Sequence, residues 1–236
     1  MSVFWMCLIT LAMLQMSVFC TTIYLHRAMT HKGLSLHPVV KFLMHLELTL
    51  FTGIVPREWV AVHRKHHYYS DQEGDPHSPL LEGMWKVLFG NFFMYRKAKS
   101  DTSMVKRFTP DWQPDLIDHI PGNRYGVLGG LVIFCLMFGW GWGFAAWLMH
   151  AILYILLNSA INSLGHAVGY RTYKNKATNL KWLALLTAGE GLHNNHHERP
   201  TSPNFLAQHD EIDLGWNLIQ VLRYLKLAKI ETEVRV

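Results

Sequence analysis

The sequence has few charged residues and confines them to two parts of the chain. Only 17% of the 236 residues are Asp, Glu, Lys or Arg, compared with roughly 25% in a typical soluble domain. Residues 1–26 and 125–170 contain none of the four, so all 22 Lys and Arg fall in residues 27–124 and 171–236. A net charge of +5 can indicate a nucleic-acid partner, but uncharged blocks between basic blocks are typical of an integral membrane protein. The sequence therefore predicts contact with membrane lipids and not with nucleic acid.

Cysteine is also scarce. Cys7, Cys20 and Cys135 are far apart, lie in apolar stretches and form no CxxC pair. An odd number of widely spaced cysteines argues against a disulfide framework and against a thiolate metal site. We interpret the three as small core residues.

The two uncharged blocks predict three membrane-spanning helices in an all-α fold. The first block, near residues 3–25, has the length of a spanning helix. A cleavable signal peptide is disfavoured because the block has neither a basic leader segment nor a small-residue cleavage site. The second block would be roughly 60 Å long as one helix, about twice the hydrocarbon thickness. We expect it to turn at "GWGWG", residues 139–143, which gives spans at about 126–140 and 143–163.

A further apolar stretch, residues 38–56, is shorter and contains Lys41, His45 and Glu47. It lies between two histidine motifs that must meet on one side of the membrane. We therefore expect a helix that lies against the membrane or dips into it. Residues 1–236 then form a single domain, in which cytoplasmic regions 26–125 and 164–236 build a helical cap.

Histidine, in contrast, is abundant, with 15 residues, and two motifs repeat one spacing: "VHRKHH" and "LHNNHH". On a helix, His63 and His67 share a face, whereas His66 lies about 100° away. His193, His196 and His197 repeat this arrangement. Two such helices that face each other can hold two metal ions, with each helix giving two ligands to one ion and one ligand to the other.

Two further motifs stand where spanning helices are expected to reach the cytoplasm: "LHRAMTH" and "INSLGH". With them, the histidines predicted at one membrane face are His26, His31, His63, His66, His67, His166, His193, His196 and His197, with Asn162 beside them. Imidazole suits Fe, Zn and Cu. Nine imidazoles exceed what closed structural zinc sites need, so the pattern favours two redox-active irons that activate dioxygen near a lipid-like substrate.

The remaining histidines are expected to be ordinary solvated, interfacial or core residues: His37, His45, His119, His150 and His209. His77, in "GDPHSP", stands apart. It is a candidate to support a ligand from outside the metal site.

The histidine motifs resemble a known family. "HRAMTH", "HRKHH" and "HNNHH" are similar to the HxxxxH, HxxHH and HxxHH boxes of membrane fatty acid desaturases. "EWVAVHRKHH", "DPHSP", "NSLGHAVGYR" and "GEGLHNNHH" resemble the stearoyl-type acyl-CoA Δ9 branch. The resemblance covers about residues 15–225 and is strongest to short bacterial members, which lack a first hairpin and a cytochrome b5 domain.

This resemblance implies an enzyme that inserts a cis double bond into a saturated acyl chain at a non-haem di-iron centre. It would use O2 and two electrons from a donor such as ferredoxin or cytochrome b5. The family pattern implies that Trp59 lies near the acyl channel and that Asn162 reaches the second iron through a water. The implied ligands are His26, His31, His63, His67 and His196 for one iron, and His66, His166, His193 and His197 for the other.

Two departures from the family leave the acyl carrier open between coenzyme A, acyl carrier protein and a glycerolipid. Ala61 stands where animal members have an Arg that contacts the coenzyme A headgroup, and Ser159 stands where they have Trp. A fatty acyl hydroxylase with the same metal site is an alternative function, and a non-enzymatic metal-binding or transport protein is another. Basic residues either dock an acidic electron carrier or only mark the cytoplasmic side: Lys97, Lys99, Lys106, Arg107, Lys174 and Lys176.

The distribution of Lys and Arg predicts the orientation in the membrane. No Lys or Arg precedes Arg27, so we expect the N-terminus outside and the C-terminus in the cytoplasm. A reporter enzyme fused after Val236 should be active only in the cytoplasm. Activity confined to the outside would contradict this orientation.

Overall fold

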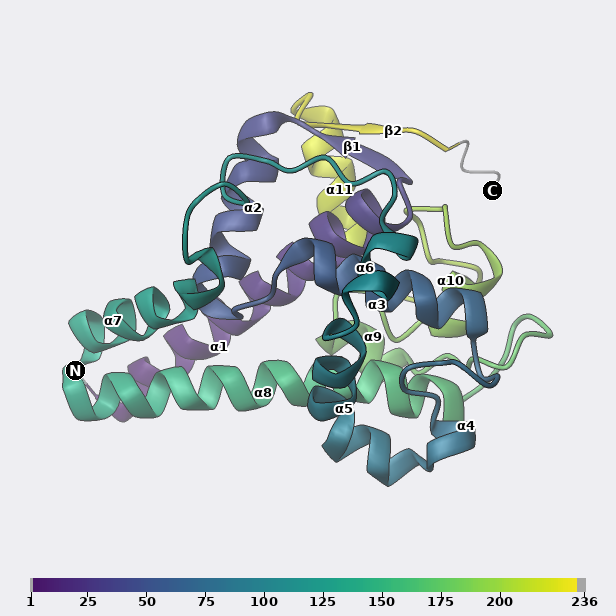
Figure 1. Cartoon of the computed structure of the whole chain (residues 1–236), viewed down its shortest axis with the longest axis horizontal. Helices are drawn as coiled ribbons and strands as arrows, with labels where there is room; N and C mark the ends of the chain where they lie inside the picture. The colour runs from purple at the N-terminus through teal and green to yellow at the C-terminus, as the bar shows by residue number, and fades with distance from the viewer. Residues whose placement is uncertain (1, 233–236) are drawn as a thin grey trace.

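The structure is a computed structural model that describes residues 2–232 and is mostly helical. Residue 1 and residues 233–236, the ends of the predicted single domain, lie outside the described residues. Three helices extend side by side from one end of the molecule (Figure 1), and they are α1 (Val3–Cys20), α7 (Gly126–Phe138) and α8 (Trp140–Ala167). The other elements gather at the opposite end. This arrangement is the predicted all-α membrane fold with a cap.

Two helices are long and apolar enough to cross a membrane. In the first, α1 continues without a break into the π-helix η1 (Thr21–Thr30), which makes one helix of 28 residues. The second is α8, also of 28 residues. The helices extend beyond the spans predicted at about 3–25 and 143–163. Both helices continue past their apolar stretch and carry the polar residues that follow it.

The structure departs further from the prediction at the middle span, which is predicted at about residues 126–140. The turn falls at Gly139, whose φ of +80° suits glycine, so α7 ends at Phe138 and has 13 residues. At 1.5 Å per residue it is about 20 Å long, less than the hydrocarbon thickness of about 30 Å. A third span exists only if α2 (Pro38–Phe51) and α3 (Pro56–Tyr69) count as one broken span, because they meet at an angle of 92°. Helix α2 occupies the stretch for which a membrane-dipping helix is predicted.

The cap consists of short helices and a small sheet. The helices are α4 (Pro79–Glu82), α5 (Met84–Lys99), α6 (Thr102–Phe108), η2 (Asn123–Tyr125), α9 (Lys181–Leu186), α10 (His193–Glu198) and α11 (Leu214–Tyr224). The sheet pairs β1 (Leu34–Leu36) with β2 (Ala228–Ile230) in antiparallel register. This sheet is not predicted from the sequence, because its strands are only three residues long. It ties the segment after the first span to the end of the chain.

A buried ion pair joins the first span to the C-terminal region. Arg27, in η1, is 1% exposed and donates to Asp213 Oδ1 at 2.9 Å and to the carbonyl oxygen of Pro203 at 2.9 Å. Its guanidinium carbon lies 3.8 Å from the centre of the Phe205 ring. A buried charge requires such partners, so Arg27 fixes the segment after α10 against the end of the first span.

Glycines allow α7 to pack closely on α2. A Cβ atom at Gly130 would lie 2.1 Å from the carbonyl oxygen of Leu50, and one at Gly126 would lie 2.4 Å from the Thr49 side chain. Small residues at helix interfaces permit this close backbone approach in membranes, where packing and not water exclusion holds helices together. The position of α7 therefore depends on these glycines.

We expect Gly130→Ala to lower the unfolding temperature of the protein in detergent, because the added methyl group forces α7 away from α2. Overpacking of this kind costs about 1–3 kcal/mol. Gly141→Ala, in α8, is the matched control, since nothing lies within 4 Å of a Cβ atom there. Alanine is favoured over glycine in a helix by about 1 kcal/mol, so the control should be neutral or stabilising. Equal unfolding temperatures for the two variants would contradict the close-packing account.

Candidate metal centre

Five parts of the chain bring the nine predicted histidines together in the cap. His26 lies in η1, His31 directly after it, and His166 in the last turn of α8. Helix α3 carries His63, His66 and His67, and α10 carries His193, His196 and His197. The ring nitrogens fall into two groups, within each of which they lie no more than 4.8 Å apart. The first group contains His26, His31, His63, His67 and His196, and the second contains His66, His166, His193 and His197.

The π-helix explains the first histidine spacing. In a π-helix the amide of one residue donates to the carbonyl oxygen five residues earlier, and here the His31 amide donates to His26 at 3.1 Å. The two rings therefore lie near each other, with centroids 4.8 Å apart. From the sequence, both residues are expected where the first spanning helix ends, and the π-helix is not predicted. The available signal for a π-helix was the spacing of five between His26 and His31, because residues five apart do not lie on the same face of an α-helix.

In the first group, the Nε2 atoms point at one another. The His26–His196, His63–His67 and His67–His196 Nε2 separations are each 3.0 Å. Two nitrogens bonded to one metal ion at about 2.1 Å and at a right angle are about 3.0 Å apart. The spacing therefore fits a metal ion with several cis imidazole ligands.

The second group has the same character. His193 and His197 place their Nε2 atoms 3.1 Å apart. The Nε2 atoms of His66 and His166 are buried and have no hydrogen-bond partner within residues 2–232. A buried nitrogen without a partner is costly, and a cation between these rings would satisfy both.

The two groups adjoin, and each HxxHH helix contributes to both. The rings of His67 and His197 are stacked with centroids 4.4 Å apart, although they belong to different groups. From α3, His66 stands in the second group while His63 and His67 stand in the first; from α10, only His196 stands in the first. This is the grouping that the helical spacing of the two motifs predicts. Two cations held here would be close neighbours.

Burial keeps the rings of α10 neutral. It lowers the pKa of His193, His196 and His197 well below the usual range for histidine, because an apolar surrounding disfavours the charged form. Neighbouring imidazoles lower these pKa values further. A neutral imidazole has a free lone pair, which is the form that binds a metal ion.

Three carboxylates orient histidines from outside the groups. His26 Nδ1 donates to Glu190 at 2.7 Å, His166 Nδ1 to Asp71 at 2.7 Å, and His66 Nδ1 to Asp75 at 3.0 Å. Each bond leaves Nε2 free to face the group. Such carboxylate–histidine pairs raise ligand basicity and fix the ring.

Charge at these carboxylates is well compensated. Burial alone would raise the pKa of Asp75, but the hydrogen bond with His66 lowers it to about 2.

Glu190, Asp71 and Asp75 are not among the residues predicted from the sequence. Their proximity to the motifs, in "GEGLHNNHH" and "SDQEGDPHSP", was the available signal.

Three other predicted residues also lie at the site. The Trp59 ring stacks on His63 with centroids 4.8 Å apart and an interplanar angle of 5°. Asn162 stands one turn before His166 and lines the adjoining cavity. His77 lies beside His66, with ring centroids 4.8 Å apart, and its two ring nitrogens are buried without a partner in the described part of the chain.

The other histidines lie outside both groups. His37, His119 and His209 are exposed. His45 and His150 are buried, and they pair with Asp115 at 2.7 Å and with Ser17 at 3.1 Å, respectively.

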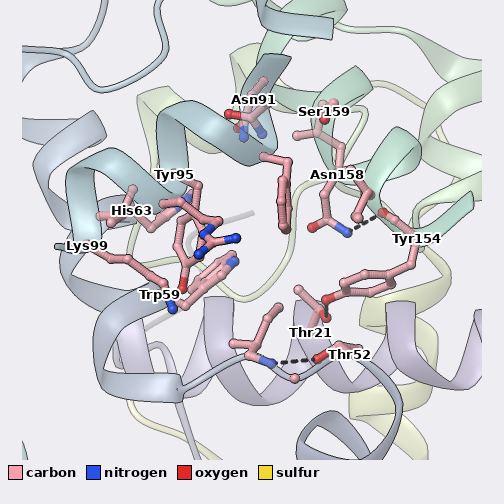
Figure 2. A pocket seen from close by; sticks show the side chains of 18 of the residues that line it. Thr21, Thr52, Trp59, His63, Asn91, Tyr95, Lys99, Tyr154, Asn158 and Ser159 are labelled. Atoms are coloured by element: carbon pink, nitrogen blue, oxygen red, sulfur yellow. Dashed lines mark hydrogen bonds between the residues drawn. The ribbon is translucent and has the colours of Figure 1, made fainter. Parts of the chain in front are cut away.

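A cavity of about 480 Å³ leads to the first group of histidines. Figure 2 shows Tyr95, Lys99, Trp59 and His63 on one side of it, and Tyr154, Asn158 and Ser159 on the other. His26, His77, Asn162 and Glu190 also line it. The cavity is thus the space from which a substrate can approach the histidines.

Comparison with known proteins agrees with this geometry. The family model for fatty acid desaturases matches residues 2–208. The chain is 32% identical over 211 residues to the sn-1 stearoyl-lipid 9-desaturase of Anabaena variabilis, covering 88% of this chain and 76% of that protein. It is 32% identical over 247 residues to the acyl-CoA C20 Delta5-desaturase of Anemone leveillei, covering 98% and 75%. It is 30% identical over 227 residues to the Delta-9 acyl-lipid desaturase 2 of Arabidopsis thaliana, covering 91% and 70%. Because the family model covers most of the chain and these relatives match it over most of their own length, this chain belongs to the fatty acid desaturase family.

Proposed function

We propose that this membrane enzyme introduces a cis double bond at the Δ9 position of a saturated acyl chain, at a centre of two iron ions. The observation that carries the proposal is the pair of adjoining histidine groups, the first of which borders the cavity through His26 and His63. The names of the similar proteins from Anabaena variabilis and Arabidopsis thaliana support the Δ9 position. In the overall reaction two hydrogens leave the chain, and with two electrons and two protons they reduce one dioxygen to two waters.

Each of the two irons would have its own group of protein ligands. The first histidine group would hold one iron and the second group the other, and Asn162 would reach the second through a water. When bound, the two irons supply the redox chemistry that removes hydrogen from an unactivated chain. The protein supplies neutral ligands, orients them through Glu190, Asp71 and Asp75, and keeps water away from the reacting carbons.

The cavity would set the position of the double bond. Trp59 lies flat on His63 and lines the cavity, so it limits how an acyl chain passes the first iron. The chain would lie beside Tyr154, Asn158 and Ser159 on the opposite wall. Only the carbons held next to the histidines would react, because positioning and not inherent reactivity selects them.

Electrons would come from an acidic carrier such as ferredoxin or cytochrome b5. Lys97, Lys106, Arg107 and Lys174 are exposed and could dock it. Lys176 is also exposed and donates to the Asp71 carbonyl oxygen at 3.0 Å, whereas Lys99 is half-buried and pairs with Glu58 at 2.6 Å. The histidine face and the cap would lie on the cytoplasmic side of a multi-pass protein, in the cytoplasmic membrane of a bacterium.

Expression in a host that lacks unsaturated fatty acids tests the function. We expect monounsaturated chains with the double bond at C9, detected by gas chromatography with double-bond location. A hydroxylated product would favour the alternative of a di-iron hydroxylase. An unmodified lipid profile from a folded, iron-loaded protein would contradict desaturation.

His166→Ala tests the two-metal arrangement, because His166 lies outside the three histidine boxes yet stands in the second group. We expect iron to fall from about two ions per chain to about one, with complete loss of desaturation. His209→Ala, which removes an exposed imidazole, is the matched control and should keep iron and activity. Iron per chain and product yield are measured for both variants. If His166→Ala behaves like His209→Ala, His166 is not a ligand.

A further inference from the structure

Helix α5 presents aromatic side chains outward and polar side chains inward. Trp85, Phe89 and Phe93 recur every four residues and are 64%, 67% and 70% exposed. Asn91, Tyr95 and Lys99 recur with the same spacing and line the cavity. A helix on a water-soluble surface has the opposite arrangement. The outward stripe of α5, defined here by Trp85, Phe89 and Phe93, therefore fits an apolar surrounding.

The neighbouring helix places this stripe at the level of the bilayer. Helix α5 packs against α8, and in Figure 1 it lies beside the half of α8 that leads to the histidines. If Trp140 and Trp142 mark one interface, a hydrocarbon core that takes about 20 helical residues to cross extends to about residue 160 of α8. The cavity residues of α8 run from Tyr154 to Asn162. Helix α5 thus stands beside the other edge of the core, where aromatic side chains accumulate.

Two of the helices that pack against α5 also carry exposed apolar side chains. Leu80 and Leu81 in α4 are 50% and 56% exposed. On α8, Leu148 and Ile152 are 41% and 49% exposed. Soluble surfaces rarely leave so many large apolar side chains together. A lipid leaflet covers such a surface without any partner protein.

The cavity reaches the surface between the two stripes of α5. Phe92 and Arg96 lie between them on the helix, and both are exposed although both line the cavity. At the inner end, His26 and Ser159 are 2% and 1% exposed. The mouth of the cavity therefore opens next to the aromatic stripe.

Just inside this mouth are two polar atoms that the protein leaves without partners. The Asn91 amide oxygen and the Tyr95 hydroxyl are buried and form no hydrogen bond with any residue that the structure describes. Both residues line the cavity, one turn apart on α5. Buried polar atoms of this kind are costly unless a ligand pairs with them. An acyl ester suits them, because its carbonyl oxygen accepts from Tyr95 while a headgroup hydroxyl donates to Asn91.

We propose that the cavity opens sideways into the bilayer beside α5 and receives the acyl chain of a membrane glycerolipid, still esterified. This inference rests on the proposed function for its chemistry, but its geometry rests on α5 and the helices packed against it. The aromatic stripe lies among the lipids, Phe92 and Arg96 border the entrance, and Asn91 and Tyr95 bind the ester and headgroup region. The carrier is therefore lipid-linked and not coenzyme A or acyl carrier protein, which would enter from water.

The first experiment measures lipid contact without any catalysis. A fluorophore is attached at Phe89→Cys, or at His209→Cys as an exposed control, in a protein whose Cys7, Cys20 and Cys135 are alanine. The protein is placed in nanodiscs of phosphatidylglycerol, with and without lipids that carry a quenching nitroxide just below the headgroup. We expect strong quenching at position 89 and little at 209. Quenching at 89 by aqueous iodide instead, or protection from both quenchers by a second copy of the chain, would overturn the proposal.

The second experiment identifies the carrier. Iron-loaded protein with a reduced electron donor receives deuterated stearoyl chains as phosphatidylglycerol in the nanodisc, as stearoyl-CoA, or as stearoyl-acyl carrier protein. We expect the lipid-linked chain to be desaturated, and we expect Asn91→Leu with Tyr95→Phe to reduce that yield by about tenfold or more without loss of iron. Desaturation of a water-borne carrier while the lipid stays saturated would overturn the proposal. If no carrier is desaturated, the proposed function fails, and the quenching at position 89 still decides whether α5 lies in lipid.

Discussion

The structure depends on gathering nine imidazoles at one place inside the cap. A buried imidazole nitrogen needs a partner, and the protein satisfies these rings from two directions. Carboxylates bind Nδ1 of His26, His66 and His166 from outside. Inside the two groups, Nε2 atoms converge at separations that fit coordination to a cation.

This requirement explains the irregular parts of the backbone. A π-helix at the end of the first span brings His26 and His31 onto one side. A bend of 92° between α2 and α3 returns the chain toward the cap, where His63 meets His26 with ring centroids 4.5 Å apart. The buried pair of Arg27 with Asp213 holds the chain after α10 in place. The π-helix and the bend each bring histidines into the first group, and π-helical segments are common at functional sites.

The same geometry places polar side chains on one face of helix α5 and apolar side chains on the other. His26 and His63 line the cavity, and helix α5 forms one wall of it. Helix α5 carries polar residues toward the cavity and exposed aromatic residues away from it. One helix therefore presents a polar face to the cavity and an apolar face to its outer surroundings.

The sequence alone determined the membrane class, the family and the identity of the clustered histidines. Uncharged blocks are a direct requirement of the hydrocarbon, and spacing within HxxHH fixes which imidazoles share a helical face. Tertiary structure alone decided the rest. The π-helix at residues 21–30 and the short length of α7 do not follow from the apolar pattern, whereas the turn at Gly139 falls in the GWGWG stretch where the sequence predicts it. The carboxylates Glu190, Asp71 and Asp75 become partners of histidines only when the chain folds. The polar inward face and the aromatic outward face of α5 likewise can be interpreted only once the position of the cavity is known. The sequence shows which residues are apolar but not what surrounds them.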